Sequence, residues 1–213
     1  MSNCEPTMIV VIEPHNCGSY PNLLEKMFRL RAHVFRDKMK WDVKVIDGME
    51  RDKYDDESPV YVVLTDQAEH HVYGSLRLLP TTGPTLLKDT FLDTLPDAVD
   101  LSSPTIWECT RLCIDERLMG DRLESLLPAS TLLIEALGEV ALKAGIETVL
   151  GVFDPIMLRI YRRIGCAVEI LGCTRRFELP VYLGAFEVSE EILGGIRRRT
   201  QRCNSNRAET LAA

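Results

Sequence analysis

The chain has 213 residues, a formal net charge of -7 and 46% hydrophobic residues. This length fits one domain with a sizeable core, and the acidic balance argues against a general nucleic-acid binder. The apolar run Met8 to Ile12 is too short for a signal peptide or a membrane span, so we expect a soluble, cytoplasmic protein. The seven cysteines include no C-x-x-C pair, which favours reduced core thiols over a metal site.

The first half of the chain predicts a strand, a helix, a polar loop and a hairpin. Residues 8–12 form the strand, and residues 22–38 have apolar side chains at helical spacing. On that helix Arg31 and Phe35 are four residues apart and therefore share a face. Two apolar runs then predict the hairpin, at 60–64 and 72–79, and Arg77 is a charge within the second of them.

The loop at residues 47–59 is acidic and long for a plain connection. It carries Asp52 and Asp55, but it lacks the spacing of a calcium-binding loop. Its carboxylates are either solvated surface or a cluster that faces a cationic small molecule.

The second half alternates helices and strands. A short helix at 88–95 carries Phe91, and a tail at 199–213 is polar and expected to be disordered. Between them we predict strands at 106–114, 147–153, 167–171 and 181–188, and helices at 125–144, 155–164 and 189–198. This order predicts one α/β domain over residues 1–198.

The strand at 106–114 carries two charges, Glu108 and Arg111, where a core strand has few. In a regular strand Glu108 and Thr110 share one face, while Arg111 points to the other. Only a bulge would bring Glu108 and Arg111 to the same side. The alternative is a strand near a sheet edge with solvated charges.

These charges occur in a recognisable order. The pattern is Arg31-x3-Phe35-x5-Trp41, Glu50-x-Asp52-x2-Asp55, Arg77 before Leu-Leu-Pro-Thr-Thr, and Trp107-Glu108-x2-Arg111. It resembles the acyl-homoserine lactone synthases, the autoinducer synthases of bacterial quorum sensing, and among them the rhizobial type.

The resemblance implies a GCN5-related N-acyltransferase-like fold, a three-layer α/β/α sandwich with a mixed, mostly antiparallel sheet. It also implies an enzyme that acylates the amine of S-adenosylmethionine from an acyl carrier protein. The product then lactonises and releases 5′-methylthioadenosine. S-adenosylmethionine is a substrate, so no cofactor is expected.

The charged and aromatic residues suit that chemistry. Carboxylates suit the cations of S-adenosylmethionine, a guanidinium suits its carboxylate, and an aromatic face suits the sulfonium. Glu108 is the candidate base, and Arg77 and Arg111 complete the predicted catalytic group. The predicted S-adenosylmethionine site comprises Arg31, Phe35, Trp41, Asp52, Asp55, Phe91 and Thr110. Some of these charges could instead pair with each other, for example Asp55 with Arg77 or Arg111.

A basic surface is expected for the acidic acyl carrier. Arg159, Arg162 and Arg163 lie on one predicted helix, and the alternative is a solvated helix face. Arg117 and Arg122 flank a turn that resembles the R-x-x-G-x-G/A diphosphate turn of GCN5-type acetyltransferases, and they could hold a phosphopantetheine phosphate. Arg122 replaces the last small residue of that turn, which argues against the rival function of an acetyl-CoA acetyltransferase. A second rival, a binder without turnover, would be expected to have lost at least one of the core charges.

Overall fold

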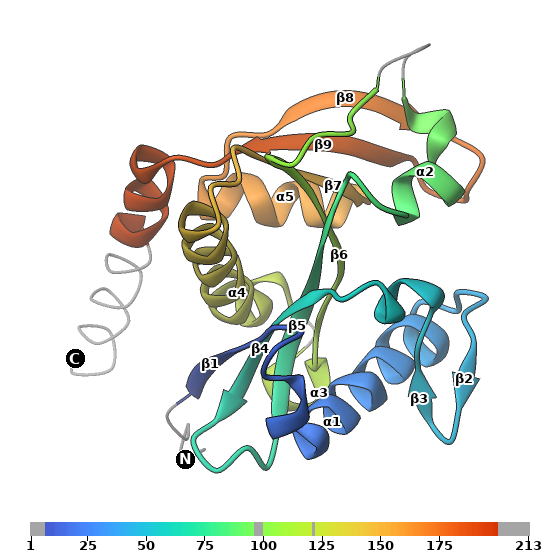
Figure 1. Ribbon diagram of the computed structural model, residues 1–213, viewed down its shortest axis with the longest axis vertical. Helices are drawn as coiled ribbons and strands as arrows, with labels where there is room; N and C mark the ends of the chain where they lie inside the picture. The colour runs from blue at the N-terminus through green and yellow to red at the C-terminus, as the bar shows by residue number, and fades with distance from the viewer. Residues whose placement is uncertain (1–6, 96–99, 121, 200–213) are drawn as a thin grey trace.

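Figure 1 shows the fold in a computed structural model, which describes residues 7–95, 100–120 and 122–199. Its main sheet has seven strands in the order β1-β4-β5-β6-β7-β9-β8. Every neighbouring pair is antiparallel except β6 and β7. The strands are β1 (Thr7–Ile12), β4 (Val60–Asp66), β5 (Val72–Pro80), β6 (Ile106–Ile114), β7 (Thr148–Phe153), β8 (Glu169–Thr174) and β9 (Val181–Glu187).

Helices cover both faces of this sheet (Figure 1). On one face lie α1 (Pro21–Arg31), a π-helix (Ala32–Lys38) and the small hairpin of β2 (Val45–Ile46) and β3 (Met49–Glu50). On the other lie α4 (Leu123–Lys143), α5 (Pro155–Ile164) and a C-terminal helix at residues 190–199. Short helices complete the chain: α2 (Leu86–Thr90), α3 (Glu116–Met119) and 3-10 turns at Cys17–Ser19, Lys53–Asp56 and Leu92–Thr94.

Each face has its own core because period-2 alternation sends successive strand residues to opposite sides. Leu23 and Met27 of α1 pack with Tyr61 and Val63 of β4. On the other side, Leu133 of α4 packs in a second apolar cluster with side chains of β4, β5 and β7. By length and hydropathy α4 could span a membrane, but here it is the core helix that covers this second face.

The predicted elements are confirmed, with boundary shifts, and the mixed, mostly antiparallel sheet is confirmed with them. The helix expected over 22–38 is α1 followed by the π-helix, and the helix expected over 88–95 is α2 followed by a 3-10 turn. Arg199, expected to begin the tail, is helical, while residues 200–213 lie outside the described residues. The hairpin of β2 and β3 was not predicted, since strands of two residues leave no periodic signal.

Candidate active site

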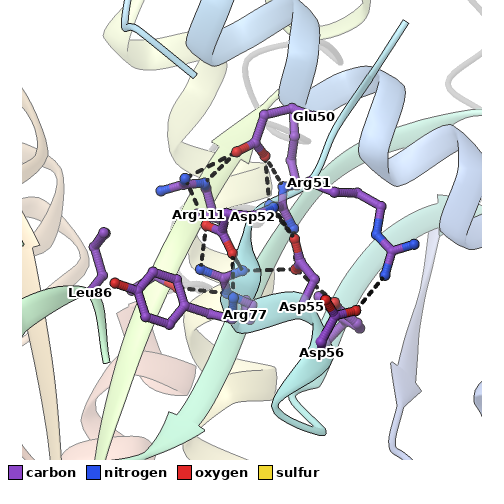
Figure 2. A network of polar contacts seen from close by, with 12 residues as sticks. Glu50, Arg51, Asp52, Asp55, Asp56, Arg77, Leu86 and Arg111 are labelled. Carbon is purple, nitrogen blue, oxygen red and sulfur yellow. Dashed lines mark hydrogen bonds and ion pairs between the residues drawn. The ribbon is translucent and has the colours of Figure 1, made fainter. Parts of the chain in front are cut away.

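Three arginines and three carboxylates form a closed ring on the α1 face of the sheet, and Figure 2 labels five of them. Each arginine contacts two carboxylates and each carboxylate contacts two arginines, at N–O distances from 2.5 to 3.0 Å. In order around the ring the members are Arg31, Glu50, Arg111, Asp52, Arg77 and Asp55, and Asp55 closes the ring on Arg31.

The acidic loop supplies its carboxylates through a capping box. Asp52 is the N-cap of the 3-10 turn Lys53–Asp56, and its side chain accepts the backbone N–H of Tyr54 at 3.0 Å. Asp55 accepts the backbone N–H of Asp52 at 2.9 Å. Hydrogen bonds to the local backbone therefore help to position both carboxylates, in addition to their contacts with the arginines. Glu50 comes from β3, so the unpredicted hairpin supplies the third carboxylate.

Burial makes the ring depend on its own pairing. Arg31 and Arg77 are 1% and 0% exposed, so an unpaired charge at either position would be strongly unfavourable. Burial by itself would lower the pKa of Arg31, but Asp55 and Glu50 outweigh burial and raise it. Burial would raise the pKa of Asp55, but Arg31, Arg77 and the Asp52 N–H hold it below its usual range. Both shifts favour the charged forms of Arg31 and Asp55, and the three arginines face an equal number of carboxylates.

A β-bulge brings Arg111 into this ring. Ser75 pairs with Cys113 but Arg77 pairs with Thr110, so one β5 residue lies opposite both Arg111 and Leu112. Arg111 takes up the extra residue with φ of +55°, a strained conformation for arginine. The expectation that Glu108 and Arg111 point to opposite faces was therefore wrong. Both lie on the α1 face, and Leu112 packs on the α4 face.

Glu108 lies beside the ring rather than within it. It is 1% exposed, and its two oxygens accept the backbone N–H groups of Leu86 (3.0 Å) and Leu87 (2.6 Å) at the start of α2. Burial raises its pKa to about 7, against the opposing effects of these two N–H groups, Arg77 and Arg111. A carboxylate with a pKa near neutrality suits a general base.

An aromatic pair borders the ring. Phe35, on the π-helix, is buried and stacks on Trp41, which is 45% exposed, with ring centroids 5.2 Å apart. The Arg111 guanidinium lies over the Phe35 ring, 5.2 Å from its centroid. The exposed indole therefore continues the site outward from the buried charges.

The structure brings most of the predicted site residues together, but with different partners. Arg31 and Asp55 pair with each other, as well as with Glu50 and Arg77, and the Thr110 hydroxyl accepts the Nε–H of Arg77 at 3.0 Å. Phe91 packs instead against Phe177, with centroids 5.8 Å apart, and beneath the guanidinium of Arg176. Glu50 belongs to the sequence pattern but was given no role, and its two-residue spacing from Asp52 was the available signal.

Comparison with known proteins places this geometry in a family. The model of the autoinducer synthase family matches residues 17–194. The chain belongs to the autoinducer synthase family. An acyl-homoserine-lactone synthase from Rhizobium etli is 44% identical over 86% of this chain and 83% of that protein. One from Pseudomonas aeruginosa is 38% identical over 70% and 74%. The chain is thus an acyltransferase of the acyl-homoserine-lactone synthase type, as predicted, and the rhizobial likeness fits.

Solved structures of the family have the same fold. The CoA-dependent synthase BjaI, solved with S-adenosylmethionine and isopentyl-CoA, matches with a TM-score of 0.82 and 27% identity over 92% of this chain and 90% of that one. LasI matches with a TM-score of 0.76 and 28% identity over 90% and 95%. An N-acetyltransferase from Lactobacillus plantarum, 17% identical at a TM-score of 0.58, shares the fold alone, over 87% of this chain and all of that one. The predicted GCN5-related fold is therefore confirmed.

In this synthase an apolar cavity lies where β6 and β7 separate. The parallel pairing of these strands ends at Cys109 and Gly151, and both residues line the cavity. Including its open mouth the cavity measures about 680 Å³, and its enclosed part is narrow and lined mainly by apolar side chains. Glu108, one residue before Cys109, points to the opposite face of the sheet. We call the point where β6 and β7 separate, at Cys109 and Gly151, the fork. The fork lies between the charged ring on one face of the sheet and the apolar cavity on the other.

The basic residues predicted to bind the acyl donor are partly brought together. Arg159, Arg162 and Arg163 are exposed on α5, and Arg163 pairs with Glu124 in the first turn of α4 at 3.0 Å. Arg122, the N-cap of α4, is exposed two residues from Glu124. The Arg117 guanidinium instead forms a two-point contact with Asp115. Within the described residues, Arg159 and Arg162 form no ion pair.

Proposed function

We propose that this synthase makes N-acyl-homoserine lactone from S-adenosylmethionine and an acyl group carried by acyl carrier protein. The observation that carries the proposal is the position of Glu108. This carboxylate has a pKa near 7 and lies between a ring of buried charges and the fork that opens into an apolar cavity. A cytoplasmic location, expected from the sequence, fits substrates of this kind.

S-adenosylmethionine would bind at the open side of the ring. Asp52 is the most exposed ring member, with 17% of its side chain accessible, and it can face the ammonium or sulfonium. The exposed face of Trp41 offers the aromatic surface for the sulfonium or adenine. Arg111 is 7% exposed and is the ring guanidinium best able to reach the substrate carboxylate. The buried Arg31, Arg77 and Asp55 would hold these groups in position.

The acyl thioester would enter at the fork, with its carbonyl near Glu108 and its chain in the apolar cavity. The amine of S-adenosylmethionine loses a proton to Glu108, directly or through a water, and attacks the carbonyl carbon. A carbon–nitrogen bond forms, the carbon–sulfur bond of the thioester breaks, and the thiolate leaves with a proton. The substrate carboxylate then attacks its own γ-carbon, closes the lactone and expels neutral methylthioadenosine. This second step needs little beyond a folded substrate conformation, because the sulfonium is already a good leaving group.

Release of methylthioadenosine should require both substrates. We expect chromatography to detect methylthioadenosine when the synthase receives S-adenosylmethionine with an acyl carrier thioester, and only background with either substrate alone. Mass spectrometry of the same mixture should find the matching acyl-homoserine lactone. Release without a thioester, or an acylated product that retains its sulfonium, would contradict the proposed reaction.

Charge reversal on α5 should weaken only carrier-bound donors. We expect the Arg159→Glu/Arg162→Glu variant to raise KM for the acyl carrier thioester, by a factor that shrinks as salt rises, because exposed charges steer an acidic partner. The double variant Arg29→Glu/Arg36→Glu changes the net charge equally on the α1 side and serves as the matched control. An unchanged KM would place the docking surface elsewhere. A higher kcat/KM for the same acyl group on CoA would identify CoA as the donor.

A further inference from the structure

The C-terminal helix forms one wall of the apolar cavity. Most of its lining comes from the sheet, α4 and α5, but Ile192, Leu193 and Ile196 of the C-terminal helix (190–199) close one side. This is the red helix of Figure 1, which lies beside α4. Leu193 and Ile196 are each 4% exposed, so this wall is packed rather than loose.

Two arginines of the C-terminal helix, Arg197 and Arg199, contact the neighbouring helices α4 and α5. Arg197 donates hydrogen bonds to Glu135, at 3.0 Å, and to Glu139, one turn apart on α4. The Arg199 guanidinium occupies the space that a side chain at Gly165 would need, at the C-terminal end of α5. A cation is favourable there because the carbonyl end of a helix is partly negative. The helix is thus fastened to both α4 and α5.

A glycine sets how closely the C-terminal helix approaches α4. Gly138 lines the cavity, and a methyl group at this position would lie 3.1 Å from Cδ1 of Leu193. That distance is tighter than ordinary van der Waals contact, so a side chain at Gly138 would take up space inside the cavity beside Leu193. Gly138 and Leu193 therefore act as a matched pair that fixes the width of the cavity.

We propose that the C-terminal helix is the wall that determines which acyl chain lengths the synthase accepts, through the contact between Gly138 and Leu193 and the Arg197 fastening. This inference rests on the proposed function, because it assigns the cavity to the acyl chain of the donor. Truncation of Leu193 lengthens or widens the cavity, and a side chain at Gly138 shortens it. Release of Arg197 lets the wall move and removes the discrimination.

The test uses the full chain and a graded series of acyl carrier thioesters, with kcat/KM measured from methylthioadenosine release. We expect Leu193→Ala to shift the preferred chain to greater length and Gly138→Ala to shift it to shorter length. In each case the ratio of long-chain to short-chain kcat/KM should change about tenfold or more, the scale of one methylene group in an apolar pocket. Arg197→Ala should flatten the length profile. Arg198→Ala, at the exposed neighbouring arginine, should leave the profile unchanged.

A binding series separates this inference from the proposed function. Dansyl-labelled fatty acids of graded length, titrated without S-adenosylmethionine, should show the same shifts in preferred length. If the wild type releases no methylthioadenosine with any donor, the proposed function fails, while the titration still tests the wall. A wild-type length profile in Leu193→Ala, Gly138→Ala and Arg197→Ala overturns the inference. Thermal melting identifies a variant that fails to fold, and Leu193→Val then replaces Leu193→Ala.

Discussion

Replacement of Glu108 by glutamine should lower the rate of methylthioadenosine release by about 10²–10⁴-fold, the usual contribution of a positioned base. Glutamine keeps the shape of the side chain but cannot accept the proton of the attacking amine. The dissociation constant for the acyl thioester should change far less, because the chain binds on the other side of the fork. Single-turnover release and thioester titration measure the two quantities. A wild-type rate in Glu108→Gln would remove Glu108 as the base.

The acid limb of the pH profile should disappear with the same change. Burial raises the pKa of Glu108 to about 7, so wild-type kcat/KM should fall as the pH decreases through that value. A raised carboxyl pKa has the opposite effect on stability. Protonated Glu108 contributes to the free energy of unfolding below about pH 4.5, and this contribution is lost as the pH rises through about 7. Activity and stability should therefore move in opposite directions across this range, and Glu108→Gln should abolish both dependences.

A structural role of Glu108 needs its own control. Its carboxylate also accepts the Leu86 and Leu87 N–H groups, and glutamine offers only one acceptor oxygen to these two donors. Thr85→Ala removes the separate N-cap of α2, a hydroxyl that accepts the Lys88 N–H at 3.2 Å, without touching Glu108. If loosening of α2 explained the loss of rate, Thr85→Ala would reproduce it. We expect Thr85→Ala to keep both the pH limb and most of the rate.

The bulge at Arg111 shows where sequence periodicity stops being informative. Alternation predicted the strand and its two faces, and both are correct up to Thr110. One extra residue then reverses the alternation, because the side-chain period is two. Nothing in the apolar pattern marks that insertion, since Leu112 and Cys113 are equally acceptable on either side. The sequence therefore favoured opposite faces for Glu108 and Arg111, and a bulge was named only as the condition that would bring them to the same side.

The ring was only partly predictable for a different reason. Sequence spacing grouped Arg31, Asp52, Asp55 and Arg77, and it raised the possibility that carboxylates pair with arginines. It could not assign the pairs, because each carboxylate here contacts two arginines from different elements. Glu50 was overlooked as a partner because its strand is two residues long. The role of each charge therefore depends on which residues it contacts in the folded chain, and neither the motif nor the periodicity of the sequence gives those contacts.

Removal of one ring cation should show that the ring is a single electrostatic unit. We expect Arg77→Met to lower the free energy of unfolding by about 3–5 kcal/mol, because it leaves Asp55 and Asp52 with one arginine fewer in a buried site. Urea denaturation measures this change. Arg51→Met is the matched control: Arg51 pairs with Asp56 at 3.3 Å, but both side chains are more than half exposed. Its effect should stay within about 0.5 kcal/mol.

Neutralising a partner should restore part of the loss. The double variant Arg77→Met/Asp55→Asn removes one charge of each sign, so it should be less destabilised than the sum of the two single variants.

The dependence of stability on acid pH should also change in Arg77→Met. Arg31 and Arg77 hold the pKa of Asp55 below its usual value. Ionised Asp55 therefore contributes to the free energy of unfolding above about pH 4, and this contribution is lost as the pH falls. Stability in Arg77→Met should therefore decline less steeply on acidification than in the wild type. Additive energies and an unchanged acid slope would mean that the six charges act as independent pairs. Coupled energies would mean that Asp52 and Arg111, the members closest to solvent, owe their positions to the four charges buried behind them.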